Sequence, residues 1–80
     1  MTHTILRLKA ILACTGLSRS TIYLRIAQGV YTKPVSLGGR AVGWPASEVA
    51  ALNAARIAGK SDADVRDLVV KLEAARKAAV

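Results

Sequence analysis

The chain has 80 residues, of which 12 are Lys or Arg and 5 are Asp or Glu, so its formal net charge is +7 at pH 7. This length favours one domain and excludes a deep catalytic cleft, because so short a chain buries only about 60% of its unfolded surface. Hydrophobic residues make up 52% of the sequence, but Ala supplies many of them and Phe is absent. We therefore expect a specific packing or contact role for each aromatic residue, namely Tyr23, Tyr31 and Trp44.

Cys14 is the only cysteine and His3 the only histidine. No intramolecular disulfide can form, which fits a reducing cytoplasm, and no metal site or cofactor is expected. We expect Cys14 to be a small core residue beside Leu12 and Leu17. The longest apolar run, residues 10–14, is far shorter than the ~20 residues of a membrane span, and the N-terminus does not read as a secretion signal. A soluble cytoplasmic protein is therefore expected.

Positive charge is concentrated in the first part of the chain. Residues 1–47 contain six basic residues and no acidic one, whereas residues 48–80 contain six basic and five acidic residues. The six basic residues of the first part are Arg7, Lys9, Arg19, Arg25, Lys33 and Arg40. A polyanion would be attracted to this part of the protein.

The first elements in chain order are an extended segment and a helix. Residues 1–7 are expected to be extended, with Ile5 and Leu6 available for a short strand. Residues 8–14 are predicted to form a helix, because their apolar residues recur at i, i+3 and i+4 and share one face. Residues 15–17 are expected to form the turn after this helix, and Gly16 can adopt the left-handed conformation that ends a helix.

A second helix is predicted over residues 19–28. Ser18 is a suitable N-cap for it and Gly29 stops it. Ile22 and Ile26 share one direction on this helix and are expected to face the core. The opposite face is then free for contact, and the two helices with their short turn form a helix-turn-helix.

A two-stranded hairpin, or wing, is predicted over residues 33–44. Alternating residues stand on both sides of the glycine pair 38–39, which favours a tight turn. Pro34 and Pro45 should bracket the hairpin, because Pro is excluded from the interior of a central strand. Arg40 would then lie at the wing tip.

A third helix is predicted to begin within residues 45–47 and to end at Gly59. Glu48 would lie near the positive end of its dipole. Its expected apolar face consists of Val49, Leu52 and Ile57. Trp44, just before this helix, is expected to pack in the core and to anchor the wing.

Residues 61–64 have the composition of a helix cap, so a fourth helix is predicted after them. Its apolar stripe consists of Val65, Leu68, Val69 and Leu72. The stripe can pack on the first and third helices or form a dimer interface, and packing is favoured because so small a domain needs its apolar faces. We therefore divide the chain into a winged helix-turn-helix domain, residues 1–60, and a C-terminal helix, residues 61–80, that packs on it or serves association.

DNA recognition needs a helix that fits the major groove with polar side chains that reach base edges. The second helix offers such side chains, Leu24 can meet a thymine methyl group, and Arg40 can enter the minor groove. The predicted DNA-binding residues are Lys9, Arg19, Ser20, Thr21, Tyr23, Leu24, Arg25, Gln28, Lys33 and Arg40. The alternative interpretation is a solvated helix face in an ordinary helical domain, with Arg40 serving solubility.

Four segments share sequence and spacing with one family. They read RLKAIL at residues 7–12, GLSRSTIYLRI at 16–26, LGGRAVGW at 37–44 and SEVAAL at 47–52. Together they resemble the AlpA-like prophage transcriptional regulators, in order over roughly residues 5–58. The resemblance implies a mainly α winged helix-turn-helix protein, related in fold to phage excisionases and to the DNA-binding part of MerR-like regulators. It also implies that the second helix enters the major groove and that the wing contacts the backbone or minor groove.

The chain departs from the family pattern in two places. An aromatic–Pro pair often follows the second helix, whereas residues 30–32 lead into Lys33 and Pro34 here. Residues 61–80 extend beyond the shorter members, so the resemblance implies no role for them.

We therefore predict a sequence-specific DNA-binding regulator of a prophage or mobile element, with double-stranded DNA as partner and possible self-association on DNA. The alternative is an excisionase-like factor that bends DNA for recombination. A protein-interaction module that uses the C-terminal stripe is less favoured. An enzyme is not expected, because no carboxylate pair lies near His3 or Cys14 and no phosphate-binding glycine loop opens a helix. Neither a small-molecule substrate nor a membrane partner is expected, since no helix combines a basic face with large apolar anchors.

Overall fold

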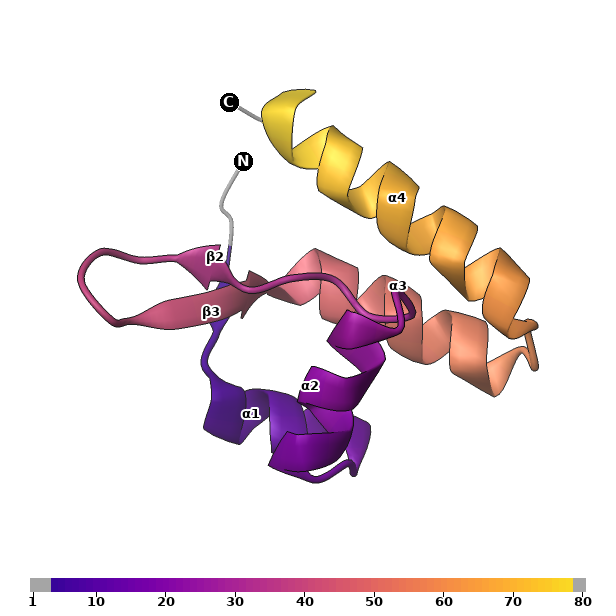
Figure 1. The fold of residues 1–80 in the computed structure, drawn as a ribbon, viewed down its shortest axis with the longest axis horizontal. Coiled ribbons are helices and arrows are strands. Elements are labelled where there is room, and N and C mark those ends of the chain that lie inside the picture. The colour runs from indigo at the N-terminus through magenta and orange to yellow at the C-terminus, as the bar shows by residue number, and fades with distance from the viewer. Residues whose placement is uncertain (1–3, 79–80) are drawn as a thin grey trace.

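The computed structural model describes residues 4–78, so His3 lies outside the described residues. The elements in chain order are β1 (Ile5–Leu6), α1 (Leu8–Thr15), α2 (Arg19–Ala27), β2 (Val35–Ser36), β3 (Val42–Pro45), α3 (Ala46–Ile57) and α4 (Asp62–Ala78). In Figure 1, α3 runs through the middle, with α4 above it and α1 and α2 below it, and the turn between β2 and β3 projects to the left. This arrangement confirms the predicted mainly α fold with a winged helix-turn-helix.

Local signals fix the helix-turn-helix as the sequence predicts. Gly16 ends α1 with φ of 72°, and its N–H donates to the carbonyl oxygen of Leu12 at 2.9 Å. Only Gly adopts this left-handed conformation without strain. Ser18 caps α2, because its hydroxyl oxygen accepts the backbone N–H of Thr21 at 3.3 Å. The turn is therefore closed at both ends by the residues expected to close it.

The sheet is antiparallel and has the strand order β1-β3-β2. Ile5 pairs with Pro45 on one side of β3, and Val35 pairs with Gly43 on the other. A β-carbon on Gly43 would lie 2.5 Å from Ile5 Cγ2 and 3.0 Å from the carbonyl oxygen of Leu6, so only Gly allows both neighbours to approach.

Pro45 corrects one expectation, because it is the last residue of the central strand rather than a residue outside it. The pairing continues past it, since the N–H of Ala46 donates to the carbonyl oxygen of Thr4 at 2.8 Å. A proline is tolerated where the strand passes into a helix.

One core joins the sheet to all four helices of the described residues. Its fully buried side chains include Ile11, Ile22, Trp44 and Val65, from α1, α2, β3 and α4. Trp44 is therefore a core residue, as expected. The stripe on α4 packs on the same core, with Val65 and Val69 buried and Leu68 and Leu72 half-buried.

Two expected core residues are exposed. Cys14 lies on the side of α1 turned away from the core, and Thr15 takes the inward position instead. Ile57 is 88% exposed, because at about 100° per residue it lies nearly opposite Ala55, which fills the inward position instead. Both errors come from alanine-rich helices, whose small side chains give little indication of the buried face.

Candidate nucleic-acid interface

Helix α2 packs on the core through Ile22 and presents its opposite face to solvent. Ile22 is fully buried and Ile26 half-buried. On the outer face, Leu24 is 57% exposed and Tyr23 39% exposed. The other exposed residues predicted to bind DNA from this helix or its C-cap are Arg19, Ser20 and Gln28. The face predicted for contact is thus open along the whole helix.

The first turn of α2 brings together a cation, an aromatic ring and hydroxyl groups. The guanidinium of Arg19 lies 5.8 Å from the centre of the Tyr23 ring, a cation–π geometry. The hydroxyl of Ser18 lies 2.9 Å from that of Thr21 and 3.2 Å from that of Ser20. Thr21 is half-buried, so its hydroxyl mainly supports the cap, whereas Ser20 is exposed.

The other predicted contacts lie on α1, at the end of α2 and on the wing. Lys9 is exposed on α1, and Arg25 is half-buried in the last turn of α2. Lys33 is exposed in the loop before β2, and Arg40 is exposed in the turn between β2 and β3. That turn is closed by two hydrogen bonds, from the N–H of Leu37 to the oxygen of Ala41 and from the N–H of Ala41 to the oxygen of Gly38. Arg40 is therefore held at the wing tip, as predicted.

The elements that carry these predicted contacts contain no acidic residue. Every acidic residue of the chain belongs to α3 or α4: Glu48, Asp62, Asp64, Asp67 and Glu73. Glu48 is also buried and paired with a cation. The surface formed by α1, α2 and the wing thus carries basic residues without a carboxylate of its own, which favours contact with a polyanion.

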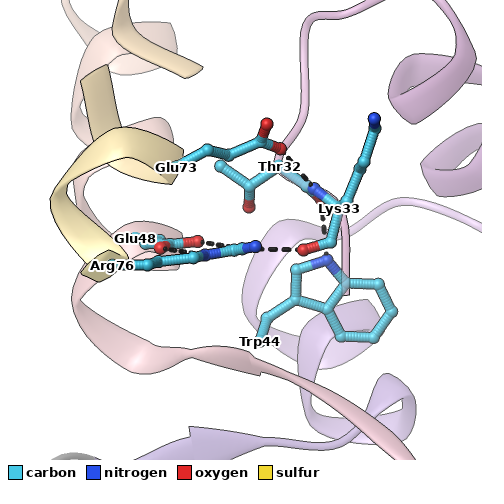
Figure 2. Close-up of polar contacts among 6 residues, drawn as sticks. All are labelled: Thr32, Lys33, Trp44, Glu48, Glu73 and Arg76. Carbon is cyan, nitrogen blue, oxygen red and sulfur yellow. Dashed lines mark hydrogen bonds and ion pairs between the residues drawn. The ribbon is translucent and has the colours of Figure 1, made fainter. Parts of the chain in front are cut away.

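The sequence reasoning missed a set of contacts between α4 and the loop of residues 28–33, which connects α2 to the wing. Arg66 Nε donates to the carbonyl oxygen of Gln28 at 3.1 Å. The N–H of Lys33 donates to Glu73 Oε2 at 2.9 Å, and Arg76 Nη2 donates to the carbonyl oxygen of Lys33 at 2.7 Å. Figure 2 shows the two contacts on Lys33, whose side chain extends away from the Arg76 guanidinium.

Arg76 also forms a bidentate ion pair with Glu48 in the first turn of α3. Its Nε and Nη2 donate to the two carboxylate oxygens at 2.7 and 2.6 Å. The hydrogen bond with Glu48 raises the pKa of Arg76 above its usual value, although burial opposes the shift. Glu48 was expected only to stabilise the helix dipole. Nothing in the local sequence indicates a partner 28 residues away.

Tyr31 belongs to the core rather than to the interface. Its side chain is buried, and burial raises the pKa of Tyr31 to about 12. The hydroxyl groups of Tyr31 and Thr32 have no hydrogen-bond partner among residues 4–78. The loop after α2 therefore enters the protein interior before the chain emerges at Lys33.

Comparison with known proteins was consistent with this geometry. Residues 4–56 match the family described as Prophage CP4-57 regulatory protein (AlpA). The chain is also similar to "Uncharacterized protein ORF88" of Enterobacteria phage P4, with 51% identity over 55 residues, which is 69% of this chain and 62% of that protein. The chain thus spans less than two thirds of the length of this relative. No solved structure matches this chain.

Two further findings concern the extent of the family match and the lengths of the helices. The family match ends within α3, so α4 and its contacts with the loop lie outside it. Among the residues that the structure describes, no helix is both long enough and apolar enough to cross a membrane.

Proposed function

The chain belongs to the AlpA family of prophage regulatory proteins, and we propose that it is a sequence-specific DNA-binding regulator of a prophage or other mobile element. The observation that carries this proposal is the distribution of charge on the fold. All charged residues of the helix-turn-helix and the wing are basic, whereas all acidic residues belong to α3 and α4. This distribution supports docking of a double helix on the side formed by α1, α2 and the wing.

In this proposal α2 enters the major groove with its N-terminal turns. Arg19, Ser20, Tyr23 and Gln28 offer hydrogen-bonding groups to base edges, and Leu24 offers an apolar contact to a thymine methyl group. Arg19 and Tyr23 act together, because their cation–π contact limits the freedom of both side chains before DNA is bound. Thr21 supports the first turn through the hydroxyl that Ser18 orients.

Three of the remaining basic residues supply affinity without reading sequence. Lys9 and Arg25 are placed to contact phosphates beside the recognition helix, and Lys33 to contact them beside the wing. Arg40 at the wing tip reaches the minor groove, where negative potential is strongest over narrow A·T-rich steps. With this division of roles, α2 selects the DNA sequence, and the basic residues beside α2 and on the wing hold the duplex in register.

The test is selection of bound duplexes from a random pool, followed by footprinting of the winning sequence. We expect one enriched motif, protected in a major groove and in the adjacent minor groove. A palindromic motif would indicate a dimer on DNA, whereas direct repeats with strong bending would favour an excisionase-like architectural factor. If no sequence is enriched relative to the random pool, the proposal is refuted.

A further inference from the structure

We propose that α4 is a brace that fixes the loop of residues 28–33 and so sets the position of the wing relative to α2, with Glu73 and Arg76 as positioning residues for DNA binding. This role rests on the DNA-binding function proposed above. It concerns a helix outside the segment that matches the family. It also concerns residues that make no proposed contact with DNA.

The loop depends on α4 because its own backbone forms little regular structure. Residues 32–34 belong to no helix or strand, yet backbone N–H and C=O groups near a core need partners. At Lys33 both groups are satisfied by α4, the N–H by Glu73 and the carbonyl oxygen by Arg76. Arg66 satisfies the carbonyl oxygen of Gln28 at the start of the loop.

These contacts fix the backbone and leave the side chain of Lys33 free. The donor and acceptor of Lys33 face α4, while its side chain extends away from Arg76 (Figure 2). A shift of the loop would therefore move the ammonium group and the start of β2 together. The brace therefore sets the position of the wing, and the charged side chain of Lys33 remains available for a phosphate.

The brace is itself anchored on the element that follows the sheet. Glu48 is 4% exposed and holds the guanidinium of Arg76 through two hydrogen bonds, in the first turn of α3 directly after β3. From the other side, the indole N–H of Trp44 donates to the carbonyl oxygen of Thr32 at 2.9 Å. The backbone of residues 32–33 is thus clamped between β3 and α4.

Glu73 gives the sharpest test, because the brace and simple electrostatics predict opposite signs. Removal of a carboxylate from a protein that binds a polyanion should tighten binding if charge alone acts. The brace predicts instead that Glu73→Ala weakens binding about threefold to tenfold, as expected for the loss of a coupling contact. Glu73→Gln retains an oxygen that can accept the N–H of Lys33, so it should bind at least as tightly as the parent.

Arg76→Lys provides the second variant. Lysine keeps the positive charge and can still pair with Glu48, but a single ammonium cannot also reach the carbonyl oxygen of Lys33 with the fork geometry of arginine. Weaker binding than the parent is expected. Lys71→Ala is the control for the exchange measurement, because Lys71 is an exposed residue of the same helix.

Binding is measured with the full chain and the duplex that the parent selects from the random pool, after each variant is shown to melt cooperatively. Amide hydrogen exchange on the free proteins supplies a readout independent of DNA. Exchange at Lys33 and through β2 should accelerate in Glu73→Ala and not in Lys71→Ala, while α1 and α2 stay protected.

Each outcome decides a separate point. If the parent binds no duplex, the proposed function fails. If the parent binds and Glu73→Ala binds equally well or better, the brace is overturned. Unchanged exchange at Lys33 in Glu73→Ala also overturns it, whatever the affinity for DNA.

Discussion

The indole N–H of Trp44 donates a 2.9 Å hydrogen bond to the carbonyl oxygen of Thr32, and both residues are fully buried. A buried indole N–H without a partner would be costly, so this bond allows the largest side chain of the protein to lie in the core. It also joins the central strand of the sheet to the loop that leaves α2. Trp44 thus links the wing to the loop that follows α2.

Trp44→Ala should damage folding before it damages recognition. Truncation of a buried Trp lowers the free energy of unfolding by about 3–5 kcal/mol, a large part of the total for so small a domain. Urea denaturation of parent and variant measures the loss. If the variant unfolds at the same urea concentration as the parent and has lost only DNA affinity, Trp44 is a contact residue.

DNA binding should depend strongly on salt. The candidate phosphate contacts are Arg7, Lys9, Arg19, Arg25, Lys33 and Arg40. If about four of them engage at once, the logarithm of the binding constant should fall against the logarithm of salt concentration with a slope near −4, from ~0.9 per phosphate. Fluorescence anisotropy across a salt series gives the slope, and a value near zero would exclude this mode of docking.

Ser20 and Tyr23 should carry sequence preference, whereas Lys33 should carry affinity alone. Loss of a base contact in Ser20→Ala or Tyr23→Ala should cost ~1–3 kcal/mol and relax preference at one position, while Lys33→Ala should weaken all duplexes about equally. Competition between the selected and random duplexes separates the two effects. Equal losses on both duplexes for the α2 variants would argue against α2 as the recognition helix.

The protein should be monomeric in free solution. Val65 and Val69 lie in the core and Leu68 packs against it, so the stripe on α4 is already occupied within one chain. Sedimentation at a protein concentration well above that used for DNA binding tests this. Leu68→Glu should then lower stability rather than change the mass. A stable dimer in the parent that becomes a folded monomer in this variant would show that the stripe is an interface.

Stability should fall at alkaline pH because of Tyr31. Burial raises the pKa of Tyr31 from 10.0 to about 12. Between these values the unfolded chain has lost the phenolic proton and the folded protein still holds it, so the stability present below pH 10 declines as pH rises through this window. Tyr31→Phe should lack this decline, which urea denaturation on both sides of the window would detect.

At neutral pH, Tyr31→Phe should be as stable as the parent or more stable. The variant removes a buried hydroxyl group that has no hydrogen-bond partner among residues 4–78. A marked loss of stability at neutral pH would show that the hydroxyl group has a partner.

Signals confined to a few neighbouring residues were enough to predict much of this fold. Gly16 and Ser18 define the turn because their chemistry acts within one helical turn, and the glycine pair 38–39 places the wing tip in the same way. Cys14 and Ile57 were assigned to the wrong faces, because alanine-rich helices have a weak apolar pattern and tertiary packing then selects the buried side.

The polar contacts of α4 could not be predicted in this way. Arg66 and the carbonyl oxygen of Gln28 are 38 residues apart, and Arg76 is 28 residues from Glu48. Such pairs depend on how two helices and a loop meet, which no short window of sequence records. The exposed face of α2 was easier to predict, because Ile22 and Ile26 mark the opposite side of one helix.

Glu48 and Arg76 lie on opposite sides of the point where the family match ends. A relative that keeps the carboxylate and the C-terminal helix but lacks the arginine would inherit a buried negative charge without its cation, which costs far more than lacking both. The two positions should therefore be inherited as one character: glutamate with an arginine-bearing tail, or a neutral residue without it. An exchange of tails between relatives would be tolerated only when position 48 changes with the tail.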